Sequence, residues 1–213
     1  MNAKKRGAEA LRPVTGNVLC LGGVDMGARQ VASGARIDNF REKLFPDEGM
    51  QTGRLFIRPL SAADAFQLVV LTNDPLVANG LSLLRQPFTL ADAQDLIALP
   101  RAKKGCFASA RSGGPEGPMV GCVGALARGA SDIEIGFWLG APFHGKSYGA
   151  EMAQAMLDRL RAVFPERRII AECPRENSAS WRLLKKLGFA PSGAAGARKG
   201  AQLLVFDAPV DVA

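Results

Sequence analysis

Residues 142–157, PFHGKSYGAEMAQAML, pass without a break from small, polar and basic residues into apolar residues at helical spacing. The first backbone N–H groups of a helix have no intrahelical acceptor, and the helix dipole adds about half a positive charge there. Gly145 and Gly149 allow a ligand to approach the backbone closely, while Ser147 supplies a hydroxyl and Lys146 a cation. Together these residues have the chemistry of a pyrophosphate-binding loop.

Two common phosphate-binding motifs do not fit this stretch. A Walker loop places its lysine after the second glycine, whereas Lys146 follows the first, and the dinucleotide fingerprint G-x-G-x-x-G has a different spacing from G-K-S-Y-G. The composition of the loop leaves a second interpretation open. In that interpretation Gly145 and Gly149 serve a turn and close packing, and no ligand binds.

The cysteines and the histidine offer no cluster for a metal or a nucleophile. No C-x-x-C spacing occurs among Cys20, Cys106, Cys122 and Cys173, and His144 is the only histidine. We therefore expect buried free thiols, no metal site and no Cys/His catalytic pair.

A chain of 213 residues, 47% of them hydrophobic, is long enough for one sizeable core and short for two. The formal net charge of +7 comes from 27 basic and 20 acidic residues, and the basic ones are scattered singly or in pairs. This distribution suits an anionic small molecule at least as well as a nucleic acid, so we expect no nucleic-acid partner. No apolar run approaches the ~18 residues of a membrane span, and we expect a cytoplasmic protein with no membrane partner.

Residues 1–49 differ from the rest of the chain. They are rich in Gly and basic residues and contain one short apolar run, at residues 18–21, without a sustained period. We expect either a disordered N-terminal extension or a stretch that precedes a natural start of translation at Met50. The remaining residues, 50–213, are expected to form one domain.

Alternation and turn residues predict strands at residues 54–60, 105–110, 119–127, 133–139, 168–173 and 203–206. Between the first two strands, Ser61 with Asp64 and Thr89 with Asp92 have the spacing of capping boxes and predict two helices.

A third helix is predicted from the apolar spacing that follows residue 148, and a fourth from Asn177 as its cap to Gly188 just beyond its end. The strand, helix and strand of residues 133–173 form a crossover, which requires parallel flanking strands. The predicted fold is therefore α+β, with a single mixed β-sheet of an antiparallel meander and a central parallel pair, flanked by helices.

Three spaced motifs resemble the GNAT acyl-CoA N-acyltransferases, in particular the RimJ/RimL-like branch. IEIGFWL before HGKSYGA, and NSAS before LKKLGF, are similar to that branch's strand EIGYWL, loop [QR]-x-x-G-x-[GA], and N-x-x-S ahead of L-x-K-x-G-F. The resemblance covers roughly residues 52–206. It implies an N-acetyltransferase, a monomer or homodimer, that moves an acetyl group from acetyl-CoA to a primary amine of a protein N-terminus or a small molecule.

The resemblance also implies where acetyl-CoA binds. In this family the strand before the loop splays from its parallel neighbour, and the pantetheine arm lies in the gap, bonded to the backbone of Phe137, Trp138 and Leu139. A backbone N–H near Leu139 would polarise the acyl carbonyl, and the amine would attack the thioester directly. The loop residues implied to bind the cofactor are His144, Gly145, Lys146, Ser147, Tyr148 and Gly149.

Two loop residues depart from the family pattern. His144 stands where the family has Gln or Arg, and Ser147 stands at the first glycine of the loop. If Ser147 must adopt a positive φ, its Cβ costs about 1 kcal/mol relative to glycine. Its hydroxyl would otherwise add a contact to phosphate, and the sequence leaves both outcomes open.

Glu134 and Ser180 are the catalytic candidates. An attacking amine must be neutral, so a base is useful, and Glu134 is an acid inside an otherwise apolar strand; the alternative is a solvent-facing residue. The tyrosine acid of many GNAT enzymes is replaced here by Leu184, and the resemblance offers Ser180 as a hydroxyl near the sulfur. Asn177 would bond the pantetheine or order water, although Asn177 and Ser180 also suit a helix cap and a first-turn polar residue.

The missing tyrosine, His144 and Ser147 motivate a second functional hypothesis. In it the chain is a catalytically silent regulatory module that binds acyl-CoA.

Overall fold

The computed structural model describes residues 18–19, 40–45, 49–81, 84–98, 105–198 and 200–207. The disorder predicted for the rest of residues 1–49 and the thiol of Cys20 therefore lie outside the described residues. Among the described residues, none of the helices is both long and apolar enough to cross a membrane.

The helices and strands occur in the order expected of an α+β chain. The helices are α1 (Phe40–Leu44), α2 (Ala65–Thr72), α3 (Pro75–Ala78), α4 (Leu90–Ala98), α5 (Tyr148–Val163) and α6 (Ser178–Lys186), with 3-10 turns at Ala62–Asp64 and Ala141–Phe143. The strands are β1 (Val18–Leu19), β2 (Met50–Gln51), β3 (Leu55–Pro59), β4 (Gly105–Ser112), β5 (Met119–Arg128), β6 (Asp132–Leu139), β7 (Arg168–Pro174), β8 (Phe189–Ala195) and β9 (Ala201–Phe206).

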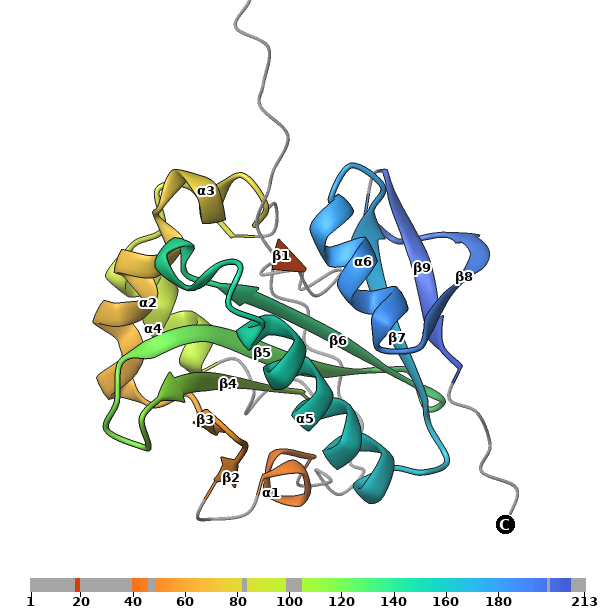
Figure 1. Ribbon diagram of the computed structural model, residues 1–213, viewed down its shortest axis with the longest axis horizontal. Coiled ribbons are helices and arrows are strands. Elements are labelled where there is room, and N and C mark those ends of the chain that lie inside the picture. Colours follow the sequence, from red (N-terminus) through yellow and green to blue (C-terminus); the bar gives the residue numbers. More distant parts are fainter. Residues whose placement is uncertain are drawn as a thin grey trace, which may run out of the picture.

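These strands form one mixed sheet in the order β2-β3-β4-β5-β6-β7-β9-β8, with β1 placed against β6 (Figure 1). Strands β2 to β6 are an antiparallel meander. The pair β6 and β7 is parallel, as the α5 crossover requires. The predicted fold class is confirmed.

The parallel strands β6 and β7 are paired only at their beginnings. Asp132–Glu134 in β6 face Arg168–Ile170 in β7, after which β7 pairs with β9 on its other side. Further along β6, the strand β1 takes the opened edge, with Val18 opposite Trp138 and Leu19 opposite Phe137. Strands β6 and β7 therefore separate as the resemblance implies, and β1 occupies the edge of β6 that this separation, here called the gap, leaves open.

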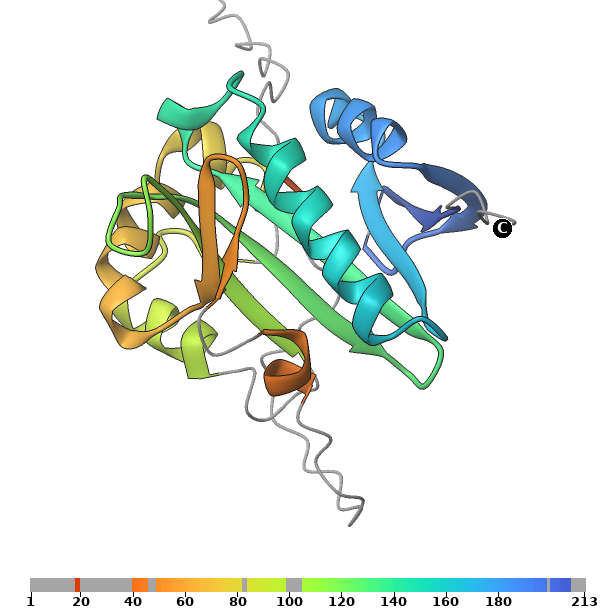
Figure 2. The same cartoon turned by 60° about the horizontal axis from the view of Figure 1, so that its bottom comes forward.

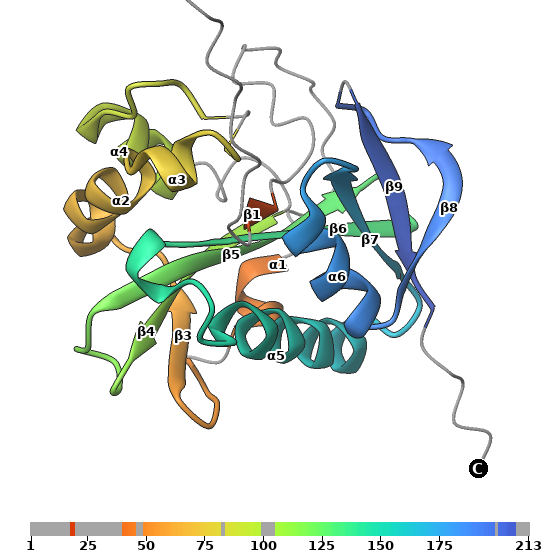
Figure 3. The same cartoon turned by 45° about the horizontal axis from the view of Figure 1, so that its top comes forward.

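Helices cover both faces of the sheet (Figures 2 and 3). On one face α1, α5 and α6 close the larger core, and on the other face α2, α3 and α4 close the smaller one. Alternate residues of β6 enter the two cores, so Phe137 and Leu139 pack beneath α5 while Trp138 packs toward α2 and α4.

The residues predicted to mark the ends of helices have the capping contacts and the backbone conformation expected of them. Asp64 accepts a hydrogen bond from the N–H of Ser61 at 2.8 Å. Thr89 donates its N–H to Asp92 at 2.8 Å, and its hydroxyl accepts from the N–H of Asp92 at 3.2 Å. Gly188 follows α6 with φ of 95°, the left-handed conformation that suits the residue after a helix.

Residues 40–45 correct the interpretation of the N-terminal segment. They lie in the part that the sequence assigns to the extension, yet Phe40, Leu44 and Phe45 are buried in the larger core. Arg159 in α5 donates a hydrogen bond to the carbonyl of Leu44 at 2.8 Å. The folded unit therefore includes α1, a helix of five residues that is too short to show a period in the sequence.

Candidate acyl-CoA site

The loop that precedes α5 has the left-handed backbone that its glycine pattern requires. Ser147 is the N-cap of α5 with φ of 62° and ψ of 10°, and no other non-glycine residue in the described ranges has a positive φ. Gly145 also has a positive φ, of 73°, and open space surrounds the position of its absent Cβ. The exposed residues of the loop are Gly145, Lys146 and Ser147.

This loop presents unpaired N–H groups together with a cation. The first amides of α5, those of Tyr148, Gly149 and Ala150, precede any intrahelical acceptor, and no acceptor for them exists among the described residues. The hydroxyl of Ser147 makes no capping bond to the helix. An anion placed here would meet several donors, the positive end of a helix of 16 residues, and the side chain of Lys146.

His144 joins the end of β6 to the loop. Its Nε2 lies 2.9 Å from the carbonyl oxygen of Leu139. Because a carbonyl only accepts, we assign the proton to Nε2. The ring therefore fixes the turn between the strand and the loop, a contact that the sequence does not predict.

Tyr148 packs beneath the loop. Its ring lies 4.6 Å below the guanidinium carbon of Arg54, and its centroid is 6.4 Å from that of Phe143 in an edge contact. The contacts of this ring are thus with the protein, whereas the backbone N–H of Tyr148 remains part of the helix terminus.

Arg54 and Glu151 brace the loop from outside, and sequence reasoning missed both. Arg54 donates from Nη1 to the carbonyl of Lys146 at 2.9 Å and from Nε to Glu151 at 2.7 Å. Partial burial raises the pKa of Glu151, but the hydrogen bonds from Thr52 and Arg54 and the charge of Arg54 outweigh it, so the pKa lies below its usual value. The two residues are 97 positions apart, so no local pattern reveals the contact.

The hydrogen-bonding register between β5 and β6 determines which backbone groups of β6 face the gap. Gly140 donates its N–H across to Val120 next to β5, at 2.9 Å. Because successive residues of a strand direct their polar groups to opposite sides, Leu139 and Phe137 face the gap and Trp138 faces β5. This corrects the expectation for Trp138, whose backbone is engaged in the sheet and whose side chain lies in the smaller core.

Glu134 is fully buried, so the alternative of a solvent-facing residue is wrong. Its Oε2 accepts a hydrogen bond from Nε of Arg128 at 2.7 Å. Glu134 lies three positions before Phe137 and five before Leu139 on the extended strand, which correspond to distances of about 10 and about 16 Å along β6. A proton could reach this carboxylate from the gap only through a chain of waters.

Asn177 and Ser180 lie together at the start of α6. The side-chain oxygen of Asn177 accepts a hydrogen bond from the N–H of Ser180 at 3.1 Å, which confirms Asn177 as the helix cap. Both residues are buried. Figure 1 places α6 beside β1, and residues of the two elements are in contact, so α6 lies next to the strand that occupies the edge of β6.

A second buried carboxylate on β7 was also missed. Glu172 accepts hydrogen bonds from the N–H groups of Ala197 at 2.9 Å and Arg198 at 3.2 Å. Arg198 also donates from its guanidinium to the carbonyl of Glu172. This arrangement fastens the turn between β8 and β9 to the strand that borders the gap.

The thiols are unsuited to covalent catalysis. Cys106, Cys122 and Cys173 are buried. Burial raises the pKa of Cys106 to about 12, with a small opposing effect of Arg41, and raises that of Cys122 further. Neither thiol of this pair is therefore a nucleophile near neutral pH. Within the described residues, no group of three or more His, Cys, Asp or Glu side chains could hold a metal ion.

A sequence profile with the description acetyltransferase (GNAT) domain matches residues 54–190. The chain belongs to the GNAT acetyltransferase family. The uncharacterized N-acetyltransferase YnaD of Bacillus subtilis (strain 168) is 37% identical over 65 residues, which are 30% of this chain and 38% of that protein. The chain thus matches well under half the length of this curated relative.

Solved structures share the acetyltransferase fold. An acetyltransferase of the GNAT family from Bacillus anthracis is 24% identical over 73% of this chain and 96% of its own, with a TM-score of 0.60. RimL, a ribosomal L7/L12 alpha-N-protein acetyltransferase solved with coenzyme A, is 18% identical over 72% and 93%, with a TM-score of 0.60. The microcin C7 self-immunity acetyltransferase MccE, solved with acetyl-CoA and AMP, is 16% identical over 76% and 96%, with a TM-score of 0.64.

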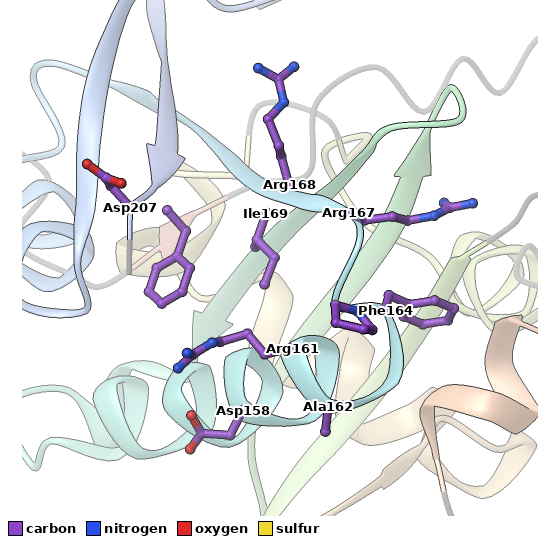
Figure 4. Close-up of a pocket in the computed structure, with 10 residues that line it drawn as sticks. Asp158, Arg161, Ala162, Phe164, Arg167, Arg168, Ile169 and Asp207 are labelled. Atoms are coloured by element: carbon purple, nitrogen blue, oxygen red, sulfur yellow. The ribbon is translucent and has the colours of Figure 1, made fainter. Parts of the chain in front are cut away.

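The acetyltransferase domain also has a hollow of about 600 Å³ at the other end of α5 (Figure 4). A helix of 16 residues spans about 24 Å, so this hollow is remote from Ser147. Figure 4 shows Arg167 and Arg168 leaving β7 and its preceding turn in different directions. Arg168 is paired with Asp132 at 2.8 Å, and Arg161 lies over the ring of Phe206 at 5.7 Å. Two of the arginine side chains that line this hollow therefore already contact other residues of the protein.

Proposed function

We propose that this chain transfers the acetyl group of acetyl-CoA to a primary amine within a ternary complex. The observation that carries the proposal is the position of two features on one strand. The gap between β6 and β7 opens along Phe137 and Leu139, and the donor-rich loop before α5 follows directly at the end of β6. A ligand with a long flexible arm and a pyrophosphate fits both features at once.

The loop would hold the pyrophosphate. The backbone N–H groups of Gly145 to Gly149 and the hydroxyl of Ser147 would donate to the phosphate oxygens, and Lys146 would add charge. His144 supports the loop through Leu139 rather than through the ligand. Tyr148 contributes its N–H while its ring packs against Arg54 and Phe143.

The pantetheine arm would lie along β6 in the place of β1. Phe137 directs its backbone groups to the gap and Leu139 its N–H, since the carbonyl of Leu139 is bound by His144. Strand β1 now pairs with β6 at Phe137 and Trp138. Acetyl-CoA would therefore displace Val18–Leu19 as it binds. Asn177 and Ser180, at the start of α6, would then border the arm from the other side, because α6 contacts β1.

In the reaction the amine nitrogen attacks the thioester carbon, the C–N bond forms and the C–S bond breaks. A backbone N–H of β6 that faces the gap would stabilise the oxyanion. The ammonium proton would leave through water to Glu134, and the hydroxyl of Ser180 would protonate the departing thiolate. Ser180 would regain a proton from solvent. No acyl-enzyme intermediate is required, in keeping with the buried, neutral thiols of Cys106 and Cys122.

The acceptor we propose is the amine of a protein N-terminus or of a small molecule. RimL, one of the similar structures, acts on a protein N-terminus according to its description. The test is an assay of thiol release with acetyl-CoA and a panel of amines: a peptide with a free N-terminus, the same peptide N-terminally blocked, and polyamines. Release that depends on an amine, with an acetylated product in the mass spectrum, supports the proposal. Thermal stabilisation by acetyl-CoA without turnover on any amine would instead identify a silent binding module.

A further inference from the structure

We propose that Arg54 is a positioning residue for the loop before α5: it fixes the peptide between Lys146 and Ser147 so that the amide of Ser147 faces the pyrophosphate. The inference rests on the proposed binding of acetyl-CoA at this loop. Arg54 comes from the start of β3, 92 positions before the carbonyl that it binds.

A hydrogen bond from Arg54 fixes one peptide plane of the loop. Nη1 of Arg54 donates to the carbonyl oxygen of Lys146 at 2.9 Å. In a trans peptide the C=O and the following N–H point in opposite directions. A carbonyl held toward Arg54 therefore turns the N–H of Ser147 away from Arg54, to the exposed side of the loop.

Glu151 and Tyr148 hold the guanidinium of Arg54 in place. Glu151, in the first turn of α5, binds Nε and Nη2 of Arg54, both at 2.7 Å. Its other oxygen accepts from the N–H of Arg54 at 2.6 Å and from the hydroxyl of Thr52 at 2.5 Å. The ring of Tyr148 lies beneath the guanidinium at 4.6 Å. One side chain thus ties the residue before the left-handed Ser147 to the helix turn after it.

Arg54 differs from an ordinary partner in a surface ion pair because it also binds the backbone of the loop. The side chain of Arg54 is 48% exposed, and exposed pairs contribute little to global stability. Its effect should therefore fall on the geometry of the loop. Since only a ligand with a pyrophosphate uses the loop amides, the effect should depend on the ligand.

This dependence gives the test. In the full chain, Arg54→Met should raise the KM for acetyl-CoA about tenfold, because loop donors held out of position bind the phosphate poorly. Its kcat/KM with acetylpantetheine, which lacks the pyrophosphate, should stay within about twofold of wild type. Arg54→Lys should resemble Arg54→Met, because lysine lacks the fork that reaches Glu151 and Lys146 together.

Arg168→Met is the matched control. It removes an exposed bidentate ion pair with Asp132, at the far end of α5, and should leave both substrates unaffected. Equal losses with acetyl-CoA and acetylpantetheine in Arg54→Met would overturn the inference, as would no loss with either. Failure of the wild-type chain to bind acetyl-CoA would instead overturn the proposed function itself.

Discussion

Arg128 donates a hydrogen bond from Nε to the buried Oε2 of Glu134 at 2.7 Å, so the acid inside β6 is held by a cation. The pair places a carboxylate on the sheet face that also carries Trp138. Burial is expected of Glu134 both if its ion pair with Arg128 is purely structural and if its carboxylate acts as a base through water. Kinetic measurements on variants can distinguish these two roles.

Glu134→Gln should lower kcat/KM for the amine about tenfold or more at neutral pH, because the ammonium proton loses its acceptor. The loss should become smaller at high pH, where more of the amine is already neutral, so the pH–rate profile should change shape in this variant. Arg128→Met is the control, since it removes the ion pair but keeps the carboxylate, and it should be less stable while losing less of kcat/KM than Glu134→Gln. A profile unchanged by Glu134→Gln would count against the role.

Substitutions at Ser147 separate the effect of its positive φ from that of its hydroxyl. Ser147→Gly should raise the free energy of unfolding by about 1 kcal/mol, because glycine adopts a positive φ without a Cβ, whereas Ser147→Ala should not. Both variants should bind acetyl-CoA about fivefold or more weakly, since both lose a hydroxyl that makes no capping bond in α5. Urea denaturation and calorimetric titration measure the two effects. Tighter binding by Ser147→Gly than by wild type would contradict the hydroxyl contact.

The sequence predicts helix ends well because the contacts that form them involve residues close together in the chain. Capping boxes at Ser61 and Thr89 and the glycine after α6 mark helix ends through contacts within a few residues. Strand β8, Phe189–Ala195, was missed because its composition is small residues and proline, and only its first residue is buried. The contacts of Arg54 and of Glu172 were missed because their partners are distant in the chain.

The thiols should be inert in the folded chain. With a pKa of about 12 for Cys106, the thiolate fraction at pH 8 is on the order of one in ten thousand. Iodoacetamide at pH 8 should therefore leave Cys106, Cys122 and Cys173 unmodified until urea unfolds the protein, as peptide mass spectrometry would show. Rapid alkylation of the native protein at any of the three would contradict their burial.

A chain that begins at Met50 should be less stable than one that begins at Phe40. The longer chain keeps Phe40, Leu44 and Phe45 in the larger core, and burying each such side chain contributes roughly 1.5–3 kcal/mol. We expect the loss of α1 to cost about 3 kcal/mol or more in urea denaturation. Equal midpoints for the two chains would show that α1 does not stabilise the domain.

Strand β1 should compete with acetyl-CoA. In the full chain, Val18→Pro with Leu19→Pro removes the backbone donors of β1 and should lower the Kd for acetyl-CoA severalfold. Val18→Ala with Leu19→Ala keeps those donors and is the matched control. Unchanged affinity in the proline variant would mean that β1 does not occupy the cofactor's place.

A crystal structure of the chain with coenzyme A would show directly whether the loop before α5 and the edge of β6 bind the cofactor. We expect a pyrophosphate within hydrogen-bonding distance of the amides of residues 145–149, the pantetheine arm along Phe137 and Leu139, and β1 released from β6. Coenzyme A bound elsewhere, or β1 still paired with β6 while the ligand is present, would contradict this expectation.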